Sequence, residues 1–244
     1  MVSKINIPLD EEGFLIRSVD YRDKDRILSF FTREHGRMDF IALGAKNSQK
    51  RFAGAIDFLN FLKLNYQSSS RGGLHRLNQV EIIESYPGIR ADYDRTVLAL
   101  EWMRLLSRAL PVENPIPGFL ELLQNHLKAL ESLPAPWVDL VFRRQALSAL
   151  GYHLELDHCL HCKKGGGGAA YFSLSRGGLL CEDCHRGATE GKIMGFFPDS
   201  WWVLGSREDP WEGRALGWAQ RLLETAYQEY LNVPPAAKSY LVKP

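Results

Sequence analysis

The chain has 244 residues, of which 45% are hydrophobic, and its formal net charge is +1. This composition indicates a globular protein, with enough apolar material for the cores of one to three domains. No stretch approaches the roughly 18 apolar residues of a membrane-spanning helix, which argues against a membrane partner. With neither a signal peptide nor a lipidation signal visible, we expect a cytoplasmic protein.

The near-zero net charge conceals an uneven distribution along the chain. Residues 1–80 carry 13 Lys or Arg against 9 Asp or Glu, residues 81–156 carry 7 against 10, and residues 157–244 carry 10 against 10. Within residues 40–80 the only acid is Asp57, although this segment holds six basic residues. A local field of this sign attracts a polyanion. The charge alone leaves open a nucleic-acid surface or an ordinary solvated face.

Residues 13–83 are predicted to form five short strands. Runs rich in β-branched and aromatic residues cover residues 13–19, 26–32, 38–44, 58–66 and 74–83. A hairpin turn is expected at residues 34–37, and the polar, Gly-rich segment 68–73 separates the last two strands. Closure into a barrel removes the edges of so short a sheet, so the pattern favours a small closed barrel of the OB-fold type.

The hydrophobic period changes to a helical one from about residue 89. Helices are predicted over residues 92–106, 117–133 and 137–150, the first stopping before Pro111 and the third ending at Gly151. Helical structure should resume after residue 189, with the longest helix over residues 211–231. The sequence thus predicts a helical region that another segment interrupts.

The interrupting segment holds all four cysteines of the chain. Cys159 and Cys162 form one Cys-x-x-Cys pair, Cys181 and Cys184 form another, and 18 residues separate the pairs. This spacing is typical of a tetrahedral zinc site. Because four thiolates fill the tetrahedron, no position stays open for water or substrate, so we expect one structural Zn²⁺.

Other interpretations of these cysteines are less favoured. Cys181 to His185 also matches the Cys-x-x-Cys-His pattern of covalent haem attachment, and two disulfides are a further alternative. Both need an oxidising compartment, whereas residues 1–10 show no apolar export signal. His158, His161 and His185 flank the cysteines and could replace one of them as a ligand, but we expect them to be exposed turn residues.

No catalytic constellation stands out in the sequence. There is no nucleophile elbow and no His-Glu-x-x-His motif, and the four glycines at 165–168 lack the Gly-Lys-Ser/Thr that would complete a phosphate-binding loop. The sequence therefore favours a binding protein over an enzyme. A nuclease is disfavoured because no clustered carboxylates are visible.

Several segments resemble one family of bacterial proteins. They read DKDRIL at 23–28, FTREHGR at 31–37, GAKNSQKRF at 44–52 and LNQVEIIES at 77–85. Further matching segments lie at 144–152, 156–159, 171–173 and 177–181, so that most of residues 10–190 is covered. In order and spacing, together with the cysteine pairs, the chain resembles the RecO family of DNA repair proteins.

The resemblance implies a multidomain α+β protein with an amino-terminal OB-fold barrel (1–84), a helical domain (85–156), an inserted four-cysteine zinc ribbon (157–188), and a second helical part with the tail (189–244). It also implies a non-enzymatic recombination mediator. Such a protein binds single- and double-stranded DNA, anneals complementary strands and contacts the tail of the single-strand-binding protein. With RecR it helps to load the recombinase, in the nucleoid of the cytoplasm.

Two sets of site residues follow, one for DNA and one for a protein partner. By motif, the resemblance assigns DNA binding to Arg33, Arg37, Lys46, Lys50 and Arg51, while Arg71 and Arg76 are added on charge alone. A pocket for the acidic, apolar tail of the single-strand-binding protein is expected near Arg143 and Arg144. The alternatives are a zinc-stabilised adaptor that binds only proteins and an OB-fold protein that binds RNA.

Overall fold

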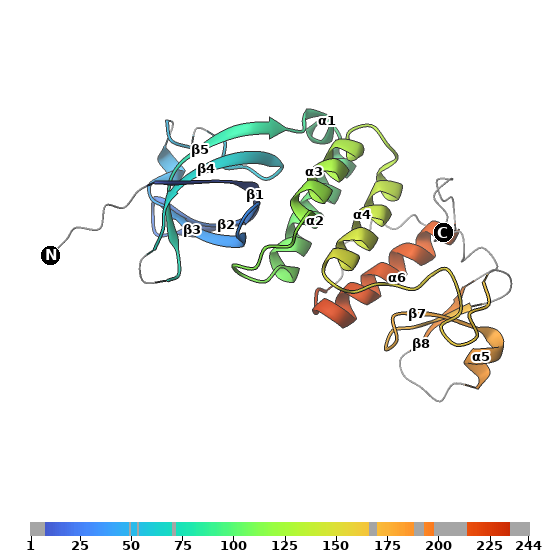
Figure 1. Cartoon of the computed structure of the whole chain (residues 1–244). Coiled ribbons are helices and arrows are strands. Elements are labelled where there is room, and N and C mark those ends of the chain that lie inside the picture. Colours follow the sequence, from blue (N-terminus) through green and yellow to red (C-terminus); the bar gives the residue numbers. More distant parts are fainter. Residues whose placement is uncertain are drawn as a thin grey trace. The chain divides into compact units, whose positions relative to one another are not determined.

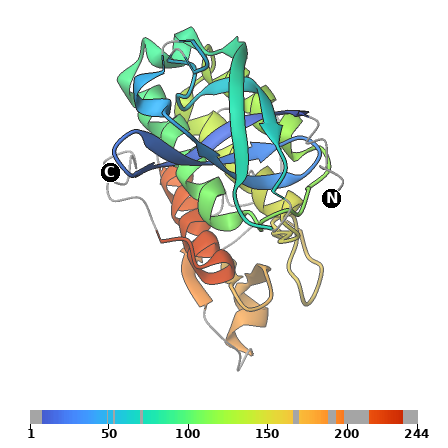
Figure 2. The same cartoon turned by 90° about the vertical axis from the view of Figure 1, so that its left-hand side faces the viewer.

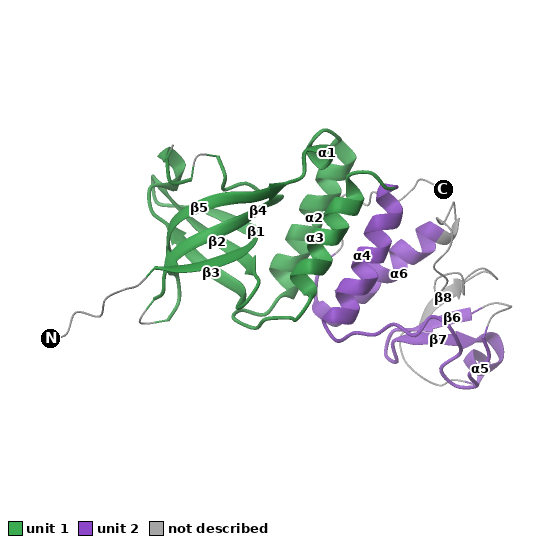
Figure 3. Ribbon diagram, turned by 45° about the horizontal axis from the view of Figure 1, so that its top comes forward, with its two compact units in different colours: residues 1–133 green, residues 134–244 purple. Residues whose placement is uncertain are grey.

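The computed structural model describes residues 8–48, 50–52, 54–69, 72–165, 170–187, 193–197 and 214–234. The chain divides into two compact units, residues 1–133 and residues 134–244 (Figure 3). The boundary between the units falls inside the segment 85–156, and the four expected domain ranges stay a prediction. None of the described helices is long and apolar enough to cross a membrane.

The first unit contains a closed barrel of five strands. These are β1 (Leu9–Tyr21), β2 (Asp25–Thr32), β3 (Gly36–Ala42), β4 (Asn60–Gln67) and β5 (His75–Ser85) (Figures 1 and 2). The order around the barrel is β1-β2-β3-β5-β4, and β1 pairs with β4 to close it. Only the short β3–β5 pairing is parallel. The predicted five-stranded barrel is confirmed, and its order is consistent with an OB-fold.

Apolar side chains, which alternate with polar ones along the strands, fill the core of the barrel. In β3 every second side chain is buried, and Met38, Phe40 and Ala42 point into the core. Phe40 contacts Phe30 edge to face, with ring centroids 5.7 Å apart. Leu28 is fully buried beside them. Phe52 closes the core from the segment after β3, where the short 3-10 helix η1 (Ala45–Asn47) lies.

Helices of the first unit cover one part of the barrel's outer surface. They are α1 (Pro87–Arg90), α2 (Tyr93–Ala109) and α3 (Phe119–Leu130) (Figure 1). Phe31 points outward from β2 and meets Phe119, with ring centroids 5.5 Å apart. Gly36 has a φ of +70°, and a Cβ there would lie 2.4 Å from the carbonyl oxygen of Asn114. Only glycine fits this close approach of the β2–β3 turn to the α2–α3 loop.

Local sequence signals explain where α2 begins and ends. The Asp92 side chain caps its first turn by accepting a hydrogen bond from the Arg95 amide. The helix stops at Ala109, just before Pro111, because proline removes a backbone donor and restricts the residue before it. Trp102, on its inner face, is completely buried. The predicted helix is confirmed, whereas the four-residue α1 was not predicted.

The second unit pairs two helices with a small sheet. Its elements are α4 (Ala135–Ala149), β6 (Ala170–Ser173), β7 (Gly178–Cys181), α5 (Glu182–Arg186), β8 (Ile193–Phe197) and α6 (Arg214–Leu231). The strands form an antiparallel sheet in the order β7-β6-β8. On α6, the Tyr227 hydroxyl donates to the carbonyl oxygen of Arg143 on α4 at 2.9 Å. The predicted helices at 137–150 and 211–231 correspond to α4 and α6.

Candidate nucleic-acid interface and metal centre

One end of the barrel brings several basic residues together. The segment after β3 is tied to the β1–β2 turn, because the Lys46 amide donates to the carbonyl oxygen of Lys24 at 3.1 Å. The Lys46 ammonium donates to the carbonyl oxygen of Arg22 at 3.2 Å. The Arg51 guanidinium donates to the carbonyl oxygen of Leu43 at 2.6 Å. Residues far apart in the sequence thus form one surface.

We call this surface the basic end; it comprises Arg22, Lys24, Arg26, Lys46, Lys50 and Arg51. Three acids, Asp20, Asp23 and Asp25, lie in the same segments, so positive charge dominates. Asp20 is shared between Lys46 at 3.1 Å and Arg26 at 3.4 Å. Lys50 and Arg51 are exposed, and within the described residues the Lys50 ammonium makes no ion pair. The basic end can therefore neutralise phosphates.

An apolar row runs across the outer face of the barrel next to the basic end. In the strand register, Val19 of β1 pairs with Ile27 of β2, and Ile27 pairs with Ile41 of β3. Ile41 in turn pairs with Arg76 of β5, whose side chain is exposed. The adjacent row, with Leu28 and Phe40, faces the core, so this row faces out. Val19 is 40% exposed.

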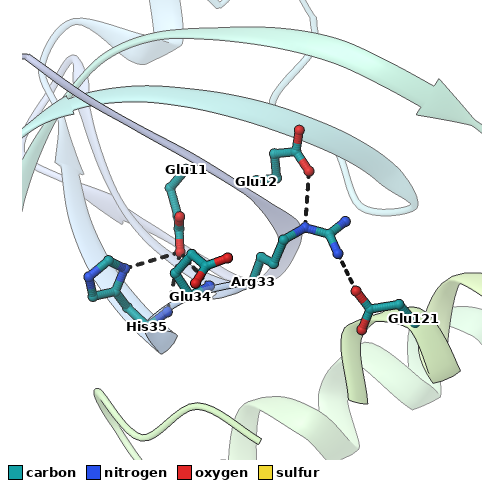
Figure 4. Close-up of polar contacts among 6 residues, drawn as sticks. All are labelled: Glu11, Glu12, Arg33, Glu34, His35 and Glu121. Atoms are coloured by element: carbon teal, nitrogen blue, oxygen red, sulfur yellow. Dashed lines mark hydrogen bonds and ion pairs between the residues drawn. The ribbon is translucent and has the colours of Figure 1, made fainter. Parts of the chain in front are cut away.

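Two of the predicted DNA-binding arginines lie at the other end of strands β2 and β3. The Arg33 guanidinium binds Glu12 at 3.2 Å and also forms an ion pair with Glu121 of α3 (Figure 4). The Arg37 guanidinium donates to the carbonyl oxygen of Ser107 at 2.9 Å, and its side chain is only 15% exposed. Both arginines therefore join the barrel to helices of the same unit.

A buried carboxylate holds the turn that carries Arg33. The Glu11 carboxylate accepts hydrogen bonds from the backbone amides of Glu34, at 2.9 Å, and His35, at 3.3 Å (Figure 4). The His35 ring lies 3.2 Å from the same oxygen. Glu11 is only 5% exposed, so these contacts offset the loss of hydration of its charge. The β2–β3 turn is thus fixed by the protein's own side chains.

The four cysteines of the second unit form a compact cluster. Their sulfur atoms all lie within 4.8 Å of one another, and all four thiols are free. The sulfurs of Cys162 and Cys181 are 3.7 Å apart. A tetrahedral Zn²⁺ with Zn–S bonds of about 2.3 Å needs sulfurs about 3.8 Å apart. The donor set and its spacing therefore fit a structural metal ion.

The thiols of this cluster are unequal. Burial opposes ionisation of Cys159, but amide donors from Cys162, Cys181 and His161 outweigh it and lower the pKa of the Cys159 thiol to about 6. The hydrogen bond with Cys181, and then burial, raise the pKa of the Cys184 thiol to about 12. Four thiolates cannot coexist so closely without a cation. The cluster is thus suited to a divalent metal, which displaces the remaining protons.

Comparison with known families gives matches over both units. The family model described as "Recombination protein O N terminal" matches residues 8–86, and "Recombination protein O C terminal" matches residues 90–239. The chain belongs to the RecO family. Membership of the RecO family supports a role in DNA repair and recombination.

Individual relatives agree with the family models. The DNA repair protein RecO of Pelobacter propionicus is 34% identical over 174 residues, which cover 71% of this chain and 70% of the relative. That of Geobacter metallireducens is 34% identical over 183 residues, covering 74% of each. That of Bacillus subtilis is 32% identical over 174 residues, covering 71% of this chain and 67% of the relative.

The expected partner-binding arginines of this RecO-family chain lie on α4. The Arg143 guanidinium donates to the Asp139 carboxylate at 2.7 Å, and its side chain is 15% exposed. Burial lowers the pKa of Arg143, but the Asp139 charge outweighs burial and keeps it above its ordinary value. Arg144 is half-buried. Phe142 and Leu147, which could form an apolar floor, are fully buried in the core.

The predicted DNA-binding residues thus lie in different parts of the first unit. Lys46, Lys50 and Arg51 meet at the basic end, and Arg76 lies beside the apolar row. Arg71 lies outside the described residues. The sequence did not point to Arg22 and Lys24, because the neighbouring Asp23 and Asp25 balance their charge. It did not predict the apolar row either. The alternation of Arg17, Val19 and Tyr21 in β1 was the available signal for that row.

Proposed function

We propose that this protein is a non-enzymatic mediator of DNA recombination, which binds single- and double-stranded DNA and anneals complementary strands. The observation that carries the proposal is the basic end, where residues from the β1–β2 turn and the segment after β3 converge on an OB-type barrel. OB-folds bind single strands with this kind of surface. Membership of the RecO family supports the same function.

The physical mechanism is charge neutralisation. Two strands repel each other through their phosphates, and a surface that neutralises phosphates on both lowers this barrier. Phosphate contacts leave the base edges free to pair, so binding is independent of sequence. Lys46, Lys50, Arg51 and Arg76 are the proposed contacts, with Arg71 retained on charge alone. Arg33 and Arg37 have a lesser share, because they lie at the other end of β2 and β3, away from the basic end, and bind helices of the same unit.

The remaining assignments belong to the same proposal. One structural Zn²⁺ is held by Cys159, Cys162, Cys181 and Cys184 in the second unit, as their spacing supports. The proposed partners are RecR, the tail of the single-strand-binding protein, which would contact Arg144, and through them the recombinase. The proposed location is the cytoplasm, at the nucleoid.

An annealing assay tests the proposal. Complementary DNA oligonucleotides, one labelled with a donor and one with an acceptor fluorophore, are mixed with and without the protein. We expect the protein to accelerate pairing at low salt without consuming a nucleotide cofactor. An unchanged rate, together with no binding of DNA at low salt, would favour a protein-binding adaptor. Stronger binding of RNA than of DNA of equal length would favour an RNA-binding protein.

A further inference from the structure

The outer face of strands β1, β2 and β3 is divided into a covered and an open part. Near the β2–β3 turn, Phe31 and Arg37 are covered by α3 and by the end of α2. Toward the β1–β2 turn, Val19 and Tyr21 stay exposed, at 40% and 36%. Ile27 and Ile41 are half-buried, and they lie between Val19 and Arg76 in the strand register. The helices of the unit leave this part of the sheet uncovered.

Charge borders the open part on several sides. Arg17 is exposed on β1, two residues before Val19 and on the same face. Arg76 ends the row on β5, and the basic end lies beyond Tyr21. The Arg22 guanidinium lies over the Tyr21 ring, 5.1 Å from its centroid. Two acids also lie on this face, but Asp39 pairs with Arg37 at 3.6 Å and Asp25 accepts a hydrogen bond from the Gly44 amide. The strip and its bordering cations complement a ligand that has flat apolar groups and a negatively charged backbone.

A single strand of nucleic acid has this combination of groups. Its unpaired bases expose their flat faces, whereas a duplex hides them in the stack. We propose that Val19, Tyr21, Ile27 and Ile41 form a base-contacting strip, on which the unpaired bases of single-stranded DNA pack while Arg17 and Arg76 hold the phosphates. This proposal rests on the proposed function and adds to it the means by which the protein distinguishes single strands from duplex.

The strip makes a prediction that the basic end does not. A strand without bases still offers its phosphates to the basic end. An abasic strand should therefore bind more weakly than a normal strand only by the affinity that contacts between the bases and the strip contribute. Base stacking on protein side chains is worth from a few-fold to more than a hundredfold in affinity per base. Changing the strip should therefore alter the preference for bases and leave the salt dependence unchanged.

The test compares two labelled probes of equal length, an oligothymidylate and a fully abasic strand, by fluorescence anisotropy at several salt concentrations. The wild-type protein should bind oligothymidylate at least about fivefold more tightly than the abasic strand. The double variant Val19→Ser/Tyr21→Ala should lose most of this preference. Its affinity for the abasic strand and for duplex, and its salt slope, should stay unchanged. Tyr21→Phe, which keeps the ring, should retain the preference.

A matched control comes from another exposed apolar residue of the barrel. Ile82 of β5 is 47% exposed and lies outside the strip, so Ile82→Ser should leave the preference unchanged. Equal melting temperatures of the variants exclude unfolding as the cause. Equal wild-type affinity for both probes, or a preserved preference in a folded Val19→Ser/Tyr21→Ala variant, would overturn the strip but leave the proposed function standing. Binding of neither probe would overturn both.

Discussion

Arg33 and Glu121 form an ion pair that links the turn after β2 to helix α3, although 88 residues separate them in the sequence. Arg33 also binds Glu12 of β1, so its guanidinium connects three elements of the first unit. Arg33, which the sequence motif assigns to DNA binding, thus also holds elements of the first unit together. This sharpens the question of which arginines are available to phosphates.

The first prediction contrasts Arg33 with Arg76. Arg33→Ala should lower the free energy of unfolding by about 0.5–1 kcal/mol, because partly exposed ion pairs are screened by water. It should change DNA affinity by less than about twofold. Arg76→Ala removes an exposed charge beside the apolar row, so it should weaken DNA binding without lowering stability. Urea unfolding and anisotropy measure the two effects. The reverse pattern would return Arg33 to the DNA surface.

A second prediction concerns His126 of α3. Burial lowers the pKa of this histidine below its ordinary value of 6.5, against the opposing hydrogen bond to the carbonyl oxygen of Leu122. Above pH 6.5 the ring is neutral in both states. As the pH falls, the unfolded chain takes up this proton first, so stability is lost from about pH 6.5 downward, toward the lower pKa of the folded protein. His126→Gln should flatten this part of the pH profile in urea titrations. An equally steep profile in the variant would assign it to other groups.

The sequence predicts most of the barrel but not its first strand in full. Apolar alternation locates the strands to within a few residues, yet β1 begins at Leu9, four residues before the predicted start at Gly13. Asp10 and Glu12 read as loop residues, but they pair with Asn65 and Lys63 of β4. This pairing depends on a partner strand some fifty residues away in the chain, which local propensity cannot reveal.

The candidate site was predicted unevenly for a similar reason. The cysteine spacing locates the metal cluster, because short motifs fix the relative position of their own ligands. The motif assigns Lys46 and Arg51 to DNA binding, but it cannot distinguish them from Arg37, whose guanidinium donates to the distant carbonyl group of Ser107. The open strip is likewise invisible in the sequence, because alternation shows which face points outward but not which part a helix covers.

A third prediction is that the purified protein holds one equivalent of zinc. Cys159→Ser should abolish stoichiometric binding, because it removes one of four ligands, a buried thiol whose pKa is lowered to about 6 and which therefore ionises readily. Removing the metal should loosen the lobe around β6 and β7 and leave the barrel folded. Metal analysis together with hydrogen exchange checks both. Less than about half an equivalent in protein prepared without chelator would contradict the assignment.

A fourth prediction separates the two α4 arginines. Arg143→Ala removes a buried ion pair with Asp139 and should destabilise the second unit, by up to about 3–5 kcal/mol. It therefore cannot report on a binding surface. Arg144→Ala should weaken binding of a labelled acidic, apolar tail peptide of the single-strand-binding protein by more than twofold, and its melting temperature checks that the variant is folded. A smaller change in the folded Arg144→Ala variant would place the tail pocket elsewhere.

The last prediction is that the basic end sets DNA affinity through phosphates. Contacts to about four to six phosphates of a single strand give a slope of log affinity against log salt of roughly −3 to −4. Changing Lys46, Lys50 and Arg51 to Glu should reduce the magnitude of this slope by about 2, at roughly 0.7 per lost contact. The same variant should anneal strands more slowly, because one charged surface serves both activities.

The control for this variant must carry the same change in net charge. Lys63, Arg108 and Lys128 belong to the same unit but lie outside the basic end, and Lys63 and Lys128 already pair with Asp10 and Glu84. Changing these three to Glu should alter the slope by less than about half as much, since a distant charge acts only through the screened field. Zinc content and melting temperature confirm that both variants are folded. An equal loss of slope in the two variants would show that net charge, and not the basic end, governs binding. An unchanged slope in the Lys46/Lys50/Arg51 variant would move the DNA surface to another part of the protein.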